Sequence, residues 1–347
     1  MKNKKTKILI VILVILIIVL GIVLAVKIFE DNKELSEDVV AETNEIEEQI
    51  VEEKKVQIYS GTDRPIAVMI DNQSGARPQA GLNDAYLVYD IIVEGGLSRM
   101  MALFKGADLE KIGPVRSSRH YFLDYALEND SIYVHYGWSP QAEKDIKKLS
   151  VNNINGITQS STFWRVKDKK SPHNAVTSTE KILEQANKFG YRTTSTEESV
   201  LNYNPEEFDL TAETAIAATD VKIPYSKYYK VNFKYNSETK RYEKYADGKA
   251  QVDWVTKEAI STKNIIITFA KNVNLPDTED KGRQDLKNIG DLEGYYITNG
   301  KAIKITCSKS ARREKTVYKD LQGNVIDVND GNTYIQICPI DANVTLE

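Results

Sequence analysis

The chain has 347 residues, of which 41% are hydrophobic and 28% are charged. This length exceeds that of one average domain, and the composition supplies a packed core and excludes a globally disordered protein. The formal net charge is −4, and no region has the basic excess that nucleic-acid binding requires, so we expect no nucleic-acid partner. No phosphate loop or dinucleotide fingerprint occurs, so we expect no cofactor.

The N-terminal segment has the pattern of a single-pass membrane anchor. Four lysines lie within residues 1–7, and residues 8–26 contain no charged side chain. This apolar stretch has roughly the length of a helix that crosses a bilayer, and it lacks the cleavage site of a signal peptide and the cysteine of a lipoprotein signal. The positive-inside rule predicts a cytoplasmic tail (1–7), a plasma-membrane anchor (8–26) and extracytoplasmic domains after it.

An acidic linker is predicted at residues 27–55. Eleven acidic residues and one lysine lie between Glu30 and Glu53. Like charges keep such a chain extended, so we expect a spacer that holds the folded part away from the membrane. A solvated helix or a weak coiled coil is the alternative, because four apolar residues have helical spacing: Leu35, Val39, Ile46 and Ile50.

Strands and helices alternate between residues 56 and 210, which predicts an α/β domain. Apolar strands are expected at 64–72, 86–93, 100–104 and 132–138, and helices at 121–127, 140–149 and 177–189. Ser139 before Pro140 is a favoured helix start. Thr177 with Glu180 has the spacing of a capping box.

Residues 211–347 have a different pattern, which predicts a smaller β-rich C-terminal domain. Residues 229–235 and 241–245 predict a hairpin, and Asn299-Gly300 predicts a two-residue turn. Cys307 and Cys338 lie in strand-like runs without metal-ligand spacing. We favour two buried free thiols. The alternative is a disulfide, which requires the two strands to be neighbours in the sheet.

The turn at residues 113–120 (GPVRSSRH) is the strongest candidate for a binding segment. Gly-Pro marks a turn, and Ser117 or Ser118 can cap the helix that follows. A helix start offers free N–H groups, and arginine adds a planar fork that matches a carboxylate or phosphate. The turn therefore predicts an anion site. The alternative is that Arg116 and Arg119 pair with structural carboxylates.

Acid–base chemistry has three candidate residues, Asp71, Glu94 and His173. Both carboxylates follow predicted strands and can share a sheet edge, either as a catalytic pair or as partners of nearby arginines. His173 lies in a turn, where a functional role is more common than in a core strand. The three histidines lack metal-ligand spacing, so we expect no metal site.

Several motifs together resemble one known family. They are found at residues 64–72 (RPIAVMIDN), 76–79 (ARPQ), 94–96 (EGG), 113–119 (GPVRSSR), 172–174 (PHN), 298–301 (TNGK) and 330–335 (DGNTYI). With them the chain, from the linker onward, resembles the YerB-like lipoproteins, which have a domain of unknown function (3048) and a C-terminal companion domain. The resemblance implies an extracytoplasmic, membrane-attached protein without a settled activity. Here a transmembrane segment replaces the lipid-bearing cysteine, and Cys307 stands where an aromatic residue is expected.

Arginines in turns suggest an acidic ligand outside the membrane. They are Arg77, Arg99, Arg116, Arg119 and Arg165. The residues expected to bind the ligand are Arg77, Glu94, Arg99, Arg116, Ser117, Ser118, Arg119, His173 and Asn174.

The first functional hypothesis is a non-catalytic cell-envelope protein. It would bind peptidoglycan, teichoic acid or a wall-remodelling enzyme through an arginine-lined cleft. One alternative is an envelope hydrolase or transferase that uses Glu94 or Asp71 with His173 as acid and base. The other is a structural subunit of a membrane complex.

Overall fold

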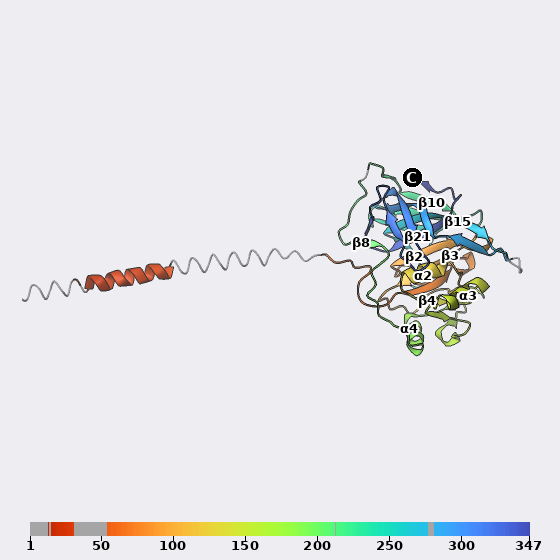
Figure 1. Cartoon of the computed structure of the whole chain (residues 1–347), viewed down its shortest axis with the longest axis horizontal. Helices are drawn as coiled ribbons and strands as arrows, with labels where there is room; N and C mark the ends of the chain where they lie inside the picture. The colour runs from red at the N-terminus through yellow and green to blue at the C-terminus, as the bar shows by residue number, and fades with distance from the viewer. Residues whose placement is uncertain (1–12, 14, 31–53, 212, 277–280) are drawn as a thin grey trace, which may run out of the picture. The chain divides into compact units, whose positions relative to one another are not determined.

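The computed structural model describes residues 13, 15–30, 54–211, 213–276 and 281–347 (Figure 1). The chain divides into two compact units, Met1–Lys54 and Lys55–Glu347. In the first unit, residues 13 and 15–30 are helical and their apolar side chains are exposed. No helix among the described residues is both long and apolar enough to cross a membrane. The predicted span at 8–26 lies partly outside the described residues, as does most of the predicted linker.

One large sheet runs through the second unit. In order of pairing, its strands are β19 (Val317–Lys319), β18 (Lys301–Lys309), β17 (Gly290–Thr298), β15 (Asn264–Asn274), β21 (Thr333–Pro339), β2 (Leu87–Ile92), β3 (Ser98–Phe104), β1 (Ile66–Asp71), β4 (Ile132–His135) and β5 (Asn153–Asn155). Two further strands pair beside this path, β16 (Gln284–Lys287) with β15 and β9 (Ile216–Ala217) with β18.

Strand β21 joins the two halves of the sequence. It pairs in parallel with β15 on one side and with β2 on the other, so that Thr333 lies opposite both Asn264 and Leu87. All its residues except the last are buried, as is typical of a parallel strand covered on both faces. The predicted α/β and β-rich regions are therefore parts of one compact unit.

A smaller sheet lies on one face of the large sheet. Its order is β13 (Lys249–Ala250), β12 (Arg241–Ala246), β11 (Lys230–Asn236), β10 (Asp220–Pro224) and β22 (Thr345–Leu346), and β14 (Ser261–Thr262) pairs with β12. Strands β11 and β12 form the predicted hairpin, which is confirmed by the pairing of Asn236 with Arg241. Two separate pairs are β20 (Asp327–Asn329) with β8 (Asn202–Asn204), and β6 (Trp164–Arg165) with β7 (Ala175–Val176).

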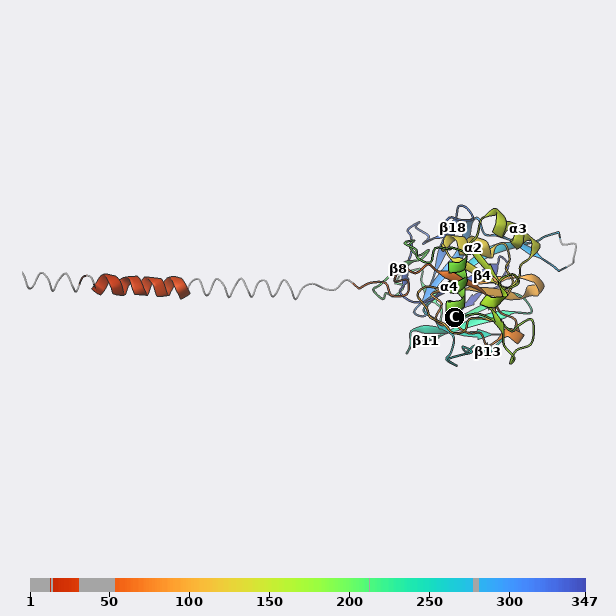
Figure 2. The ribbon, with the colours of Figure 1, turned by 90° about the horizontal axis from the view of Figure 1, so that it is seen from below.

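Within the described part of the second unit, the helices all lie before residue 189. They are α2 (Phe122–Glu128), α3 (Pro140–Lys148), α4 (Thr179–Lys188) and the short 3-10 helices η1 (Ser74–Ala76), η2 (Glu94–Gly96) and η3 (Ser160–Thr162). The hydroxyl of Ser139 accepts a hydrogen bond from the N–H of Ala142, so the predicted cap of α3 is confirmed. Figure 2 shows α2 and the strands β11 and β13 on opposite sides of this unit.

The other predicted caps are wrong. At α4, Ser178 and not Thr177 caps the helix, because the hydroxyl of Ser178 accepts from the N–H of Lys181. At α2, no side chain caps the first turn. The hydroxyl of Ser117 donates to the carbonyl of Tyr136, and that of Ser118 accepts from the hydroxyl of Tyr133. The hydroxyl of Thr177 likewise donates to the carbonyl of Thr162. In each case the hydroxyl that was predicted to cap a helix forms a hydrogen bond with a residue outside that helix.

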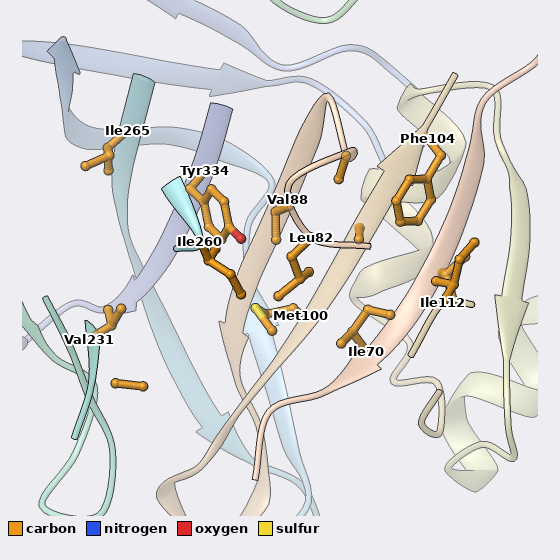
Figure 3. Packing of buried hydrophobic residues seen from close by; sticks show 14 of the residues in the cluster. Ile70, Leu82, Val88, Met100, Phe104, Ile112, Val231, Ile260, Ile265 and Tyr334 are labelled. Atoms are coloured by element: carbon orange, nitrogen blue, oxygen red, sulfur yellow. The ribbon is translucent and has the colours of Figure 1, made fainter. Parts of the chain in front are cut away.

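The core has two layers, one on each face of the large sheet. Successive residues of β1 point to opposite faces: Ile66, Val68 and Ile70 belong to one buried cluster, and Ala67 and Met69 to the other. The first cluster packs the large sheet against β11 and β12, as Figure 3 shows in part. The second cluster packs the opposite face against α2.

Both cysteines are free and buried, as the favoured prediction had it. Cys307 lies in β18 and Cys338 in β21, and the strands β17 and β15 separate them. Burial raises the pKa of both thiols. The two side chains are therefore part of the core.

Candidate functional site

The carboxylate of Asp71 is the centre of the candidate site. Asp71 is the last residue of β1, and only 2% of its surface is exposed. Its Oδ2 lies 2.7 Å from Nδ1 of His173 and 3.4 Å from Nε of Arg116. Its Oδ1 accepts a hydrogen bond from the N–H of Gln73. The structure thus brings together Asp71, His173 and Arg116, three of the residues that the sequence predicts for the site.

Main-chain contacts hold Arg116 beside Asp71. The N–H of Asp71 donates to the carbonyl of Pro114, and the N–H of Arg116 donates to the carbonyl of Met69. The turn at 113–120 therefore runs along the end of β1 as an extra antiparallel segment. Its position is fixed by backbone hydrogen bonds, which do not depend on the arginine side chains.

His173 comes from the loop that connects β6 with β7. Its ring packs against η1, where a Cβ at Gly75 would lie 3.1 Å from Cδ2 of the imidazole. A glycine at this position therefore lets the backbone approach the ring closely. Because Nδ1 faces Asp71 and the side chain is 19% exposed, Nε2 is the ring nitrogen that remains for solvent or a ligand.

A cavity of about 340 Å³ lies beside Arg116. Its lining includes Arg116, Ser117, Tyr136, Trp138, Arg165 and Pro172. Within the described part of the chain, the buried Nε of Arg116 makes no hydrogen bond. The guanidinium of Arg165 lies 5.1 Å from the centroid of the Tyr136 ring and donates to Oδ1 of Asn174. The side chains of two arginines, Arg116 and Arg165, therefore line one cavity.

Glu94, Arg99 and Arg119 form an adjoining cluster that is paired internally. Nε of Arg119 lies 2.6 Å from Oε1 of Glu94. Burial raises the pKa of Glu94, but the hydrogen bond and the charge of Arg119 outweigh burial, so the net shift is downward. Arg99 is buried and donates to the carbonyl of Ser117. Burial, and then the charge of Arg119, lower the pKa of Arg99 to about 10.

Arg77 is used in contacts with the C-terminal part of the sequence. Its Nη1 lies 2.8 Å from Oδ2 of Asp247, and its Nη2 donates to the carbonyl of Asn72. Its guanidinium also lies 5.4 Å from the centroid of the Tyr229 ring. Among the predicted arginines, Arg116 and Arg165 thus line the cavity, whereas Arg77 connects two parts of the fold.

Two residues near the site were missed by the sequence analysis, Lys169 and Trp254. The ammonium group of Lys169, from the same loop as His173, lies 4.4 Å from the centroid of the Trp254 ring. Burial lowers the pKa of Lys169, and the charge of Asp71 is among the effects that oppose it. The run of lysines at 167, 169 and 170 is a visible signal of positive charge, but nothing in it points to a distant tryptophan.

The other two histidines lie elsewhere. Nε2 of His120 lies 2.8 Å from Oδ1 of Asp285. His135 is fully buried, and burial lowers its pKa to about 4. Within the described ranges, no group of three or more His, Cys, Asp and Glu side chains is placed to hold a metal ion.

Comparisons with known proteins identify one family and one related structure. Family models described as the N-terminal and C-terminal domains of "Protein of unknown function (DUF3048)" match residues 52–192 and 221–335. The chain is 30% identical over 289 residues to "Putative lipoprotein YerB" of Bacillus subtilis (strain 168), which covers 80% of this chain and 81% of the relative. A crystal structure of YerB from Bacillus subtilis matches with a TM-score of 0.72 and 30% identity, over 82% of this chain and 94% of that chain.

Proposed function

Because the chain belongs to the DUF3048 family, together with the YerB protein, we propose that it is a membrane-attached, extracytoplasmic protein of the cell envelope that binds an acidic ligand. The word lipoprotein in the name of the relative supports the envelope location. The lysine-rich and apolar pattern of residues 1–26 supports attachment through the N-terminal segment, with its first residues in the cytoplasm.

The proposed ligand site is the cavity beside Arg116. The observation that carries this proposal is the presence of two arginine side chains, Arg116 and Arg165, in the lining of one cavity. A guanidinium fork matches the geometry of a carboxylate or phosphate. Arg119 and Arg99 contribute less, because Glu94 and the carbonyl of Ser117 already engage them.

The chemistry of the site fits three envelope ligands. These are the carboxylates of peptidoglycan stem peptides, the phosphates of teichoic acid and an acidic side chain of a wall-remodelling enzyme. In each case the anion would accept hydrogen bonds from Arg116 and Arg165 in a partly enclosed cavity, where charge-assisted bonds are stronger than in open water.

Sedimentation with purified cell walls tests this proposal. The full-length chain in mild detergent is mixed with walls before and after their teichoic acid is removed, and the pelleted fraction is measured. Loss of a hydrogen bond to a charged group costs about 1.5–3 kcal/mol, so we expect Arg116→Ala and Arg165→Ala each to weaken binding roughly 10- to 100-fold. The sample without teichoic acid shows whether the anion is a phosphate.

Arg192→Ala is the matched control. Arg192 is half exposed and pairs with Asp130, so its loss removes an arginine without touching the cavity. Equal losses in the control and in Arg116→Ala would indicate non-specific charge attraction and would contradict the proposed site. If the wild-type chain does not pellet with either wall sample, wall binding is wrong, and a protein partner or the structural-subunit alternative takes its place.

A further inference from the structure

His173 and Asp71 have the arrangement of an acid–base pair, and Asp71 also contacts Arg116, which lines the proposed ligand cavity. We propose that His173 is the general base and acid in the hydrolysis of a phosphodiester held by Arg116 and Arg165, and that Asp71 positions its ring. This inference rests on the proposed function, because it uses the same cavity. It adds an activity and narrows the ligand to one chemical class.

The contacts of the ring support this role. Oδ2 of Asp71 lies 2.7 Å from Nδ1, so the buried carboxylate fixes the ring orientation and leaves Nε2 to accept a proton. A carboxylate in this position also stabilises the imidazolium that forms when the proton arrives. The partial exposure of the His173 side chain gives a small molecule access to the ring.

Arg116 connects the acid–base pair with the cavity. Its Nε lies 3.4 Å from the same Asp71 oxygen that contacts His173, and its side chain lines the cavity. Pro172, the neighbour of His173 in the chain, lines the cavity too. Arg116 and His173 therefore contact one carboxylate oxygen, and the positive charge of Arg116 would stabilise the negative charge that grows on the oxygens of a phosphate bound beside it.

A second histidine–carboxylate pair shows what distinguishes this one. His120 also contacts a carboxylate at 2.8 Å, but that carboxylate, on Asp285, is 26% exposed and also binds Lys287. An arginine, Arg312, also lies near His120. Its guanidinium forms ion pairs with the carboxylates of Asp124 and Asp145. The His173 pair thus combines a buried carboxylate with an arginine side chain that lines the proposed ligand cavity.

The proposed reaction needs water as its only co-reactant. Nε2 of His173 takes a proton from a water molecule, whose oxygen forms a bond to phosphorus. The bond between phosphorus and the leaving alcohol oxygen breaks, and the proton on Nε2 passes to that oxygen. The products are a phosphomonoester and an alcohol. Diesters of glycerol phosphate provide this chemistry in two envelope sources, the polyol-phosphate wall polymer and the phospholipid head group.

Turnover of three defined substrates tests the inference. The full-length chain in mild detergent is incubated with bis(p-nitrophenyl) phosphate, with poly(glycerol phosphate) polymer and with phosphatidylglycerol vesicles, and alcohol release is measured. General acid–base groups contribute typically 10²- to 10⁴-fold, so we expect His173→Gln to lower turnover by at least about 100-fold. Cleavage of the polymer or of the vesicles identifies the source of the diester.

Two further variants complete the test. His120→Gln removes the other carboxylate-bound histidine and is expected to keep full turnover. His173→Ala is expected to be inactive and to regain turnover when imidazole is added, which a merely structural histidine would not do. Thermal unfolding followed by circular dichroism confirms that each variant is folded.

Two outcomes overturn the inference and leave the proposed function intact. One is a wild-type chain that binds walls but hydrolyses none of the three substrates. The other is a folded His173→Gln variant that retains wild-type turnover. Failure of the wild-type chain to bind walls instead contradicts the proposed function, so the two results are distinguishable.

Discussion

At the scale of single residues, buried charge in this protein supports the fold as well as the candidate site. Nζ of Lys309 lies 2.6 Å from Oε2 of Glu128, and both side chains are almost completely buried. Lys244 is also buried, and burial lowers its pKa to about 8 although the charge of Asp90 opposes the shift. Neither of these lysines lines a described cavity, so a buried charge alone does not mark a functional residue here. Asp71 differs in that its carboxylate contacts both His173 and Arg116, which lines a cavity.

His135 predicts how stability depends on pH. Burial lowers its pKa from 6.5 to about 4, so the unfolded chain binds a proton before the folded protein does. Its contribution is therefore fully present above pH 6.5 and is lost as the pH falls towards 4, by up to about 3 kcal/mol. We expect the free energy of unfolding in urea to fall more steeply between pH 7 and 4.5 for the wild type than for His135→Gln. Parallel pH profiles would show that His135 does not titrate in this way.

At the scale of elements, the sequence correctly predicted the strands, helices and turns that depend on the local sequence pattern. Strands β1 to β4, helix α3 and the β11–β12 hairpin occur where apolar periodicity and turn residues placed them. The turn at Asn299-Gly300 is confirmed, with the positive φ at both residues that a tight hairpin turn requires. The caps at Thr177 and at Ser117 or Ser118 failed because distant partners use their hydroxyls, such as the carbonyl of Thr162 for Thr177. Local sequence cannot show that competition.

Ser139→Ala tests the cap that the sequence placed correctly. The hydroxyl of Ser139 satisfies the N–H of Ala142 in the first turn of α3, and loss of such a cap costs about 1 kcal/mol. We expect a fall of this size in the free energy of unfolding, measured in urea. Gln141→Ala, on the exposed side of the same helix, is the control and should change stability little. A loss in Ser139→Ala no larger than in the control would show that the cap is not needed.

At the scale of the whole molecule, one strand near the C-terminus connects the N-terminal and C-terminal regions into a single sheet. Two family models match separate N-terminal and C-terminal regions, yet β21 pairs with β2 from the first and β15 from the second. Pairing between strands this far apart leaves no local pattern, so the sequence predicted the strands but not their order. The contacts within the candidate site also join residues that are far apart in the sequence. The sequence already suggested Asp71 or Glu94 as the partner of His173, whereas the contact of Lys169 with Trp254 becomes visible only when both halves are folded together.

The shared sheet predicts that both halves of the sequence unfold together. The chain has three tryptophans, of which Trp138 and Trp164 lie in the first half and Trp254 in the second. Trp254→Phe leaves fluorescence that reports on the first half, and a Trp138→Phe/Trp164→Phe double variant reports on the second. Because removal of β21 from either neighbour would leave buried strand edges unpaired, we expect each variant to unfold in urea at the same midpoint by fluorescence as by circular dichroism. A fluorescence midpoint that departs from the circular dichroism midpoint in either variant would show two units that unfold separately, and the continuous sheet would then not make the chain cooperative.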